Sequence, residues 1–112
     1  MDLSSVLALH EALDAKFAQD IVIMDLEEVS PIADYFVIAT GGSTAHMSAL
    51  AETTEQSLVG SGFKLSHIEG VGTSNWVLLD FGSVVVHLFD KESRGYYNLE
   101  RIWGDAKIVE PK

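Results

Sequence analysis

Two acidic residues, Asp25 and Glu27, are the first candidates for chemistry in this chain of 112 residues. They are two positions apart, so a β-strand would place both carboxylates on one face. Two carboxylates on one face can share a magnesium ion, which is an arrangement that metal-assisted phosphoryl transfer uses. A catalytic site of this kind also needs a phosphate-binding turn and further acids nearby.

The glycine-rich turn Gly41-Gly42-Ser43-Thr44 lies between a strand-like run and a helical pattern. Backbone N–H groups and the helix dipole at such a turn can hold an anion. The turn lacks the lysine of a Walker loop and the third glycine of a dinucleotide-binding fingerprint. We interpret it as a turn that caps a helix, with an anion site as the alternative.

A metal-dependent nucleotidyltransferase would combine these two features, but their order along the chain is wrong for it. In that class of enzyme the acid pair follows the glycine-serine turn, whereas Asp25 and Glu27 precede it. The later strands supply only Asp80 and Asp90, which do not form a second pair. One carboxylate cannot hold the two metal ions that phosphoryl transfer generally uses. We therefore predict no catalytic residues, and keep a metal-dependent nucleotidyltransferase-like enzyme as the alternative.

The remaining residue types that carry chemistry are sparse. The chain has no cysteine, which excludes disulfides and thiolate catalysis and favours a reducing compartment. Its four histidines, His10, His46, His67 and His87, do not have the spacing of metal ligands. His10 lies on the apolar stripe of a predicted helix and is expected in the core, while His87 interrupts an apolar strand. We predict neither a metal nor a cofactor.

The elements that would position these residues follow from the spacing of the apolar residues, which make up 47% of the chain. Helical patterns cover about 3–18 and 47–58, and a loop with a short helix is expected at 91–103. Strands are predicted at 21–24, 35–40, 63–68, 76–81 and 84–89. The order αββαβββα predicts an α/β (α+β) fold, with a mixed five-stranded sheet covered by helices on one or both sides. The length predicts one domain, residues 1–112.

The predicted hairpin at 76–89 carries the strongest indication of an interface. Strand alternation puts Trp76, Leu78 and Asp80 on one face, and the residues between them on the other. If helices cover only the Val77 side, then Trp76 and Leu78 form an apolar surface bordered by an acid, which is typical of a binding hot spot. The alternative is a sheet buried on both faces.

The charge of the chain narrows the class of partner. Seventeen acidic residues against seven lysines and arginines give a net charge of −10, and no lysine or arginine occurs between Lys16 and Lys64. Binding to a phosphate backbone needs clustered basic residues, so nucleic acid is not expected as the main contact. The charge either keeps a small protein soluble or attracts a basic protein. The chain also lacks a basic secretory start and an apolar run of roughly 20 residues, so we expect it in the cytoplasm and not in a membrane.

Five segments of the sequence resemble the Iojap-like family of ribosomal silencing factors, in order and spacing. They are DYFVIATG at 34–41, EG at 69–70, WVLLDFG at 76–82, VVVHLF at 84–89 and YYNLERIWGDA at 96–106. The resemblance covers about residues 3–107. It implies a topology similar to that of nucleotidyltransferases, without their catalytic acids.

The resemblance also implies a function and a partner. Members of this family bind ribosomal protein fourteen of the large subunit and obstruct joining of the small subunit, which lowers translation when nutrients are scarce. We carry the contact surface onto seven residues of this chain: Trp76, Leu78, Asp80, Tyr97, Asn98, Leu99 and Arg101. A homodimer formed through the hairpin at 76–89 is a further possibility, and it would hide this surface.

Overall fold

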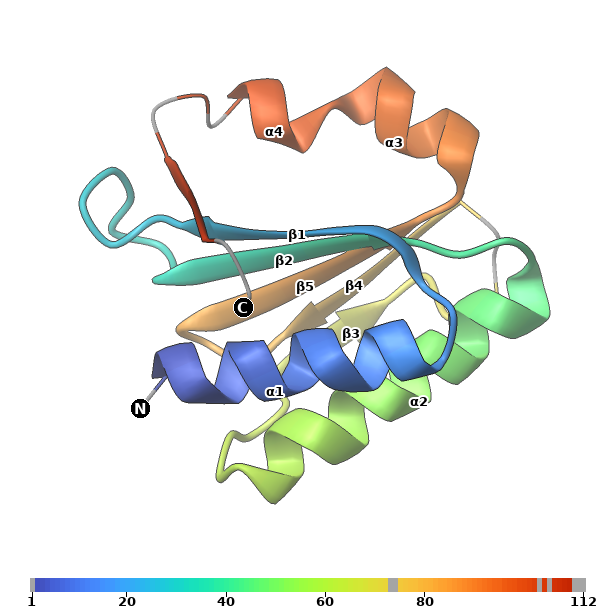
Figure 1. The fold of residues 1–112 in the computed structure, drawn as a ribbon, viewed down its shortest axis with the longest axis horizontal. Coiled ribbons are helices and arrows are strands. Elements are labelled where there is room, and N and C mark those ends of the chain that lie inside the picture. The colour runs from blue at the N-terminus through green and yellow to red at the C-terminus, as the bar shows by residue number, and fades with distance from the viewer. Residues whose placement is uncertain (1, 73–74, 103, 105, 110–112) are drawn as a thin grey trace.

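The computed structural model describes residues 2–72, 75–102, 104 and 106–109. Within these residues, six strands form one mixed sheet in the order β3-β4-β5-β2-β1-β6 (Figure 1). In chain order the elements are α1 (Asp2–Ala15), β1 (Gln19–Asp25), β2 (Tyr35–Thr40), α2 (Thr44–Gly60), β3 (His67–Glu69), β4 (Trp76–Asp80), β5 (Val84–Phe89), α3 (Lys91–Tyr97), α4 (Leu99–Ile102) and β6 (Lys107–Val109). The predicted α/β (α+β) class with a mixed sheet is confirmed.

The centre of the sheet is the parallel pair β2 and β5, in which Tyr35 aligns with Val84 and Thr40 with Phe89. Every residue of both strands is buried. Continuous apolar strands of this kind require a sheet that is covered on both faces. β4 pairs antiparallel with β5, so the predicted hairpin is also confirmed.

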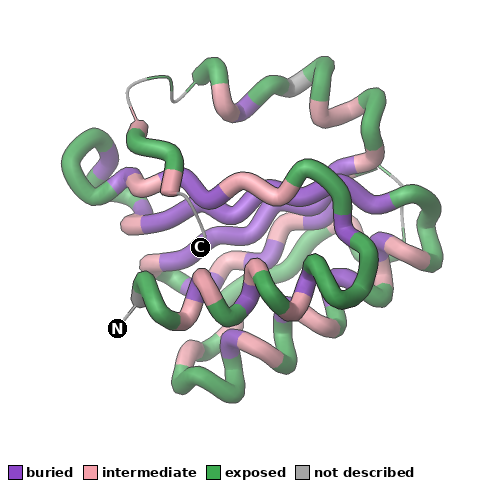
Figure 2. The backbone as a smooth tube through the Cα atoms, in the orientation of Figure 1, coloured by how far each residue is buried: buried purple, intermediate pink, exposed green. Residues whose placement is uncertain are grey.

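Helices cover both faces of the sheet (Figure 1). α1 and α2 pack side by side on one face, and α3 and α4 lie across the other. The larger apolar core joins Leu13 of α1 and Leu50 of α2 to Val77 of β4. A smaller core on the opposite face joins Leu99 of α4 to Phe36 of β2. Figure 2 shows the buried strands between two layers of largely exposed helices.

The sixth strand corrects the predicted strand count and element order. β6 pairs antiparallel with β1 and aligns Val109 with Ile23. Its three residues are too few to show an alternating pattern, so it could not be predicted from the sequence. The short helix predicted at 91–103 is also wrong in number, because the described residues form two helices separated by Asn98, whose φ is +50°. Trp103, the last residue of that predicted helix, lies outside the described residues.

The first helix ends earlier than predicted. α1 stops at Ala15, and Phe17 adopts a left-handed conformation with φ of +68° that a helix does not continue through. The side chain of Phe17 is therefore 81% exposed, although it matched the apolar stripe. The stripe that packs on the sheet is formed by Val6, Leu9 and Leu13. His10, expected in the core, is only half-buried.

β3 also differs from its prediction at 63–68. Only residues 67–69 pair with β4, and all three are exposed. Phe63 and Leu65 gave the segment its alternating pattern, and they pack against the larger core without belonging to a strand. β3 is consequently a short strand at one edge of the sheet.

The glycine turn before α2 is a helix cap, as interpreted from the sequence. The Ser43 side chain accepts a hydrogen bond from the His46 backbone N–H at 3.0 Å. The predicted apolar stripe of α2 is buried and consists of Met47, Leu50, Ala51, Thr54 and Leu58. Among the helices that the structure describes, none is both long and apolar enough to cross a membrane.

Candidate partner-binding site

Strand β4 presents two chemically different faces. Val77 and Leu79 are fully buried on the face that α2 covers, whereas Trp76, Leu78 and Asp80 are half-buried on the opposite face. The alternation predicted from the sequence is confirmed. The Asp80 carboxylate accepts a hydrogen bond from the Gly82 N–H at 2.8 Å, which fixes the tight turn into β5.

The face that carries Trp76 is partly covered, which lies between the two alternatives left open by the sequence. α3 and α4 lie over this side of the sheet, and Trp76 and Leu78 pack against the margin of the smaller core. Neither residue is fully buried, and the strand that α3 contacts most is β5, the neighbour of β4. Trp76 and Leu78 therefore form a partly exposed apolar surface on β4, the strand next to the edge strand β3.

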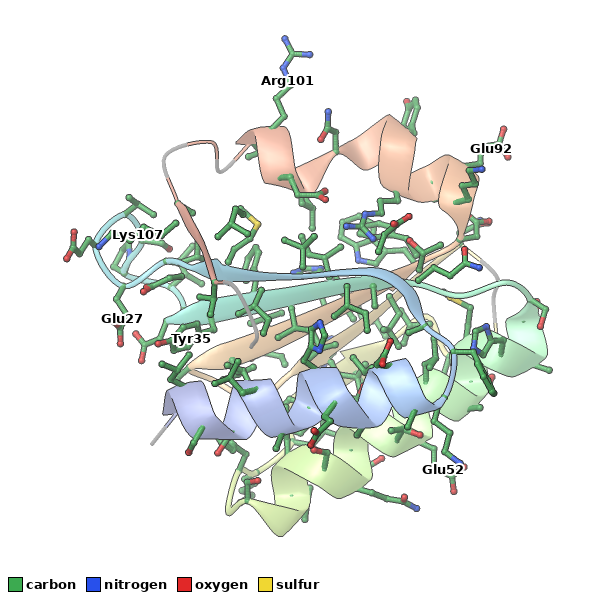
Figure 3. All side chains as sticks on the ribbon, viewed as in Figure 1. Glu27, Tyr35, Glu52, Glu92, Arg101 and Lys107 are labelled. Atoms are coloured by element: carbon green, nitrogen blue, oxygen red, sulfur yellow. The ribbon has the colours of Figure 1, made fainter. Side chains whose placement is uncertain are left out.

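The four expected neighbours from the last helices are placed unequally. Leu99 is 9% exposed and belongs to the smaller core, so it positions α4 and offers little surface to a partner. Asn98 and Arg101 are exposed, and Arg101 points away from the sheet (Figure 3). The side chain of Tyr97 lies outside the described part of the chain. The structure therefore groups Trp76 and Leu78 with Leu99, and leaves Arg101 apart from them.

The structure adds two residues that the sequence reasoning missed. Glu69 lies opposite Leu78, and His67 lies opposite Asp80, in the β3–β4 pairing. Directly opposed residues on antiparallel strands point to the same face, so both side chains join the face of Trp76. Their spacing of two residues was the available signal, but the face they occupy is set by the register between β3 and β4. Together Glu69, Gly70, Trp76 and Leu78 line a hollow of about 190 Å³.

His87 of β5 fixes the orientation of the Trp76 indole through a side-chain hydrogen bond. The Trp76 Nε1–H donates a hydrogen bond to His87 Nδ1 at 3.2 Å, and the rings of Phe36 and Phe89 lie 4.5 and 6.4 Å from the imidazole. Burial lowers the pKa of His87 to about 4, although the nearby carboxylate of Asp80 acts in the opposite direction. His87 is therefore neutral at physiological pH and keeps Nδ1 available as an acceptor.

Replacement of His87 should flatten the dependence of stability on pH. The pKa of His87 is about 4 in the folded chain and near its ordinary value of 6.5 in the unfolded chain, so between these values the unfolded chain binds more protons. The contribution of His87 to the free energy of unfolding should be constant above about pH 6.5 and should fall as the pH drops toward 4. From about pH 7 to about pH 5 the imidazole should contribute a loss of about 2 kcal/mol.

Urea unfolding of the wild type and of His87→Gln at several pH values measures this loss. The variant retains a hydrogen-bond acceptor but does not titrate, and all carboxylates are common to both proteins. Equal pH dependence in the two proteins would show that the folded state does not hold His87 neutral.

The parts of the candidate catalytic site are far apart in the fold. Asp25 lies at the end of β1 opposite Tyr35, the first residue of β2, while Gly42 follows the other end of β2. The Asp25 carboxylate accepts a hydrogen bond from the Glu27 backbone N–H at 3.0 Å. The Gly42 N–H donates to His46 Nδ1 at 2.9 Å, so the turn already uses this group internally. Within the described residues, no group of three or more histidine or acidic side chains could hold a metal ion.

Comparisons with known proteins agree on one family. Residues 2–112 match the family described as ribosomal silencing factor during starvation. The ribosomal silencing factor of Bacillus subtilis (strain 168) is 40% identical over 111 residues, which cover 98% of this chain and 94% of that protein. The ribosomal silencing factor of Halalkalibacterium halodurans is 41% identical over 99 residues, or 88% of this chain and 85% of that protein.

A solved structure supports the same assignment. The crystal structure of a protein from Chromobacterium violaceum superimposes with a TM-score of 0.84 at 32% identity, covering 91% of this chain and 85% of that one. A match along nearly the whole sequence together with a shared fold confirms the resemblance seen in the sequence motifs. The chain belongs to the ribosomal silencing factor family.

Proposed function

We propose that this chain acts in the cytoplasm as a single ribosome-binding domain that silences the large ribosomal subunit. It binds ribosomal protein fourteen and blocks joining of the small subunit when nutrients are scarce. The observation that carries the proposal is the half-buried pair Trp76 and Leu78, on a sheet face that the helices leave partly open.

The composition of this face suits a protein partner. A partly exposed tryptophan beside an aliphatic side chain can act as the apolar anchor of an interface, and the carboxylates of Asp80 and Glu69 border it. Ribosomal proteins are generally basic, so a chain with a net charge of −10 is attracted to them. The same charge opposes binding to exposed ribosomal RNA, which favours the protein surface.

Silencing by obstruction requires affinity and bulk and no chemical step. The described part of the chain extends 34 × 31 × 28 Å, so a bound copy occupies about 30 Å in every direction. Two subunit surfaces that meet directly cannot close around a rigid body of this size. We therefore propose a role without catalysis, which agrees with the separation of Asp25 from the glycine turn at the two ends of β2.

Co-sedimentation with separated ribosomal subunits tests the proposal. The chain should pellet with large subunits and not with small ones, and the bound fraction should fall as salt is raised because the attraction is partly electrostatic. Excess chain added to both subunits should reduce the fraction that sediments as whole ribosomes.

Equal binding to both subunits, or binding without any effect on joining, would contradict the proposed function. Light scattering of the free chain supplies the control for a dimer. A homodimer formed through the β4–β5 hairpin would hide the surface that large subunits are proposed to bind. If the free chain has the mass of a dimer, each large subunit should therefore bind a single copy of it.

A further inference from the structure

The hollow beside Trp76 is formed by two strands and the bend that follows β3. Its lining residues are Glu69, Gly70, Trp76 and Leu78, and its volume is about 190 Å³. Glu69 and Leu78 are directly opposed across β3 and β4, so their side chains lie next to each other on the same face. The hollow thus has an apolar wall on β4 and a carboxylate on the edge strand β3.

The apolar wall is held in a fixed orientation. The Trp76 indole is hydrogen-bonded to His87 through Nε1–H, and its ring lies 5.0 Å from the ring of Phe89 at an interplanar angle of 33°. Burial of His87 keeps it a neutral acceptor for this bond. A preorganised aromatic wall loses little conformational entropy when a ligand packs against it.

The backbone of Gly70 maintains the shape of the hollow. Its φ is +87°, a conformation that side chains rarely adopt, and a Cβ at this position would clash with the backbone carbonyl oxygen of Trp76. Only glycine lets the chain after β3 pass this close to the start of β4. The two sides of the hollow therefore approach closely at the backbones of Gly70 and Trp76.

The side chain of Glu69 lines the hollow and is largely exposed. Its Oε2 lies 2.8 Å from His67 Nε2, and the side chains of both residues are more than half exposed. This exposed contact is weak and leaves Oε1 able to accept another donor. Asp80 lies on the same face, opposite His67, and adds negative charge.

An apolar wall with a carboxylate at its rim is complementary to a side chain that has an aliphatic stem and a cationic head. Lysine and arginine pack their stems along apolar surface while the charge stays at the margin, and a cation near an indole gains further attraction. A nucleic acid base stacked on Trp76 would instead bring phosphate close to Glu69 and Asp80, which is unfavourable. The apolar wall and the negative charge of the hollow therefore both favour a lysine or arginine side chain.

We propose that this hollow receives one lysine or arginine side chain of the large-subunit protein that the chain binds. The inference rests on the proposed function, and it makes Glu69 a specificity-determining residue of the interface. The stem of the basic side chain packs on Trp76 and Leu78, and its charge pairs with the Glu69 carboxylate.

The test measures the affinity of full-length variants for purified large ribosomal subunits. Glu69→Gln should weaken binding about tenfold, and Glu69→Lys by more than about a hundredfold, because the first removes the paired charge and the second opposes it. Glu52→Gln is the matched control, since it removes the same charge from α2 on the other side of the sheet (Figure 3). That control should change affinity less than about twofold.

His67→Gln separates pairing with a partner from a structural role of the His67–Glu69 contact. If Glu69 pairs with the partner, this variant should bind at least as tightly as the wild type, because a competitor for the carboxylate is gone. The proposal is overturned if His67→Gln weakens binding as much as Glu69→Gln does, or if Glu69→Gln binds unchanged. Tighter binding by Glu69→Gln would also overturn it and indicate contact with RNA.

The two levels of the hypothesis fail in different ways. A wild type that does not bind large subunits would overturn the proposed function, and the occupant of the hollow with it. A wild type that binds large subunits with Glu69→Gln equally tight would overturn the occupant alone. Circular dichroism of each variant should match the wild type, since Glu69 lies on an exposed edge strand.

Discussion

Trp76→Ala should lower the affinity of the chain for large ribosomal subunits about a hundredfold, equivalent to about 3 kcal/mol. The indole is the largest apolar side chain on the partly open face of β4, and its hydrogen bond to His87 fixes its orientation. Truncation removes the proposed anchor of the interface and one wall of the adjacent hollow. Co-sedimentation or biolayer measurements with purified large subunits would quantify the loss.

A loss of folding must be separated from a loss of contact in this variant. Trp76 is only half-buried, so its truncation should destabilise the chain by about 2 kcal/mol, which a domain of ordinary stability survives. Phe17→Ala is the matched control, because it removes a more exposed aromatic ring from the turn between α1 and β1. It should change affinity less than about twofold. A folded Trp76→Ala variant that binds like the wild type would show that the contact surface lies elsewhere.

Leu78 and Leu79 should respond to alanine substitution in opposite ways, although they are neighbours on one strand. Leu79 is fully buried in the larger core on the face that α2 covers, so Leu79→Ala should lower the free energy of unfolding by about 3 kcal/mol. Leu78 lies half-buried on the proposed contact face. Leu78→Ala should cost about 1 kcal/mol of stability but weaken binding to large subunits about tenfold.

Urea unfolding and subunit binding, measured on both variants, form an internal control. The substitution and the strand are the same, so only the face of the sheet differs. If the two variants lost stability and affinity in equal proportion, then the two faces of β4 would not have separate roles.

The central strands and α2 could be predicted because their patterns are local. β2 and β5 are continuous apolar runs, and α2 has a capping serine and a regular buried stripe. The parallel pairing of β2 with β5 is a contact between distant segments, which apolar spacing does not encode. β6 was missed because a three-residue strand has no period, and the first helix was extended too far because Phe17 matches the stripe but lies in a left-handed turn.

The candidate site shows the same division. Strand alternation correctly grouped Trp76, Leu78 and Asp80, because alternation is a property of one strand. Glu69 was missed because its place beside Leu78 is set by the register between β3 and β4. The family resemblance placed Leu99 on the contact surface, but α4 turns its side chain into the smaller core. Residues that act through pairing between elements need the fold before they can be assigned.

The pairing of β6 with β1 has a consequence for how the sheet folds while the chain is being synthesised. The two strands lie next to each other in the sheet, but about three quarters of the sequence separates Asp25 from its partner Lys107. While the chain emerges from the ribosome, β1 can pair with β2 early, but its other side stays an unpaired backbone edge until residues 107–109 have been made. Contacts of such long sequence separation form slowly, and open edges can pair with other chains. The nascent protein therefore depends on its last short strand to close a sheet whose first strand was made at the start.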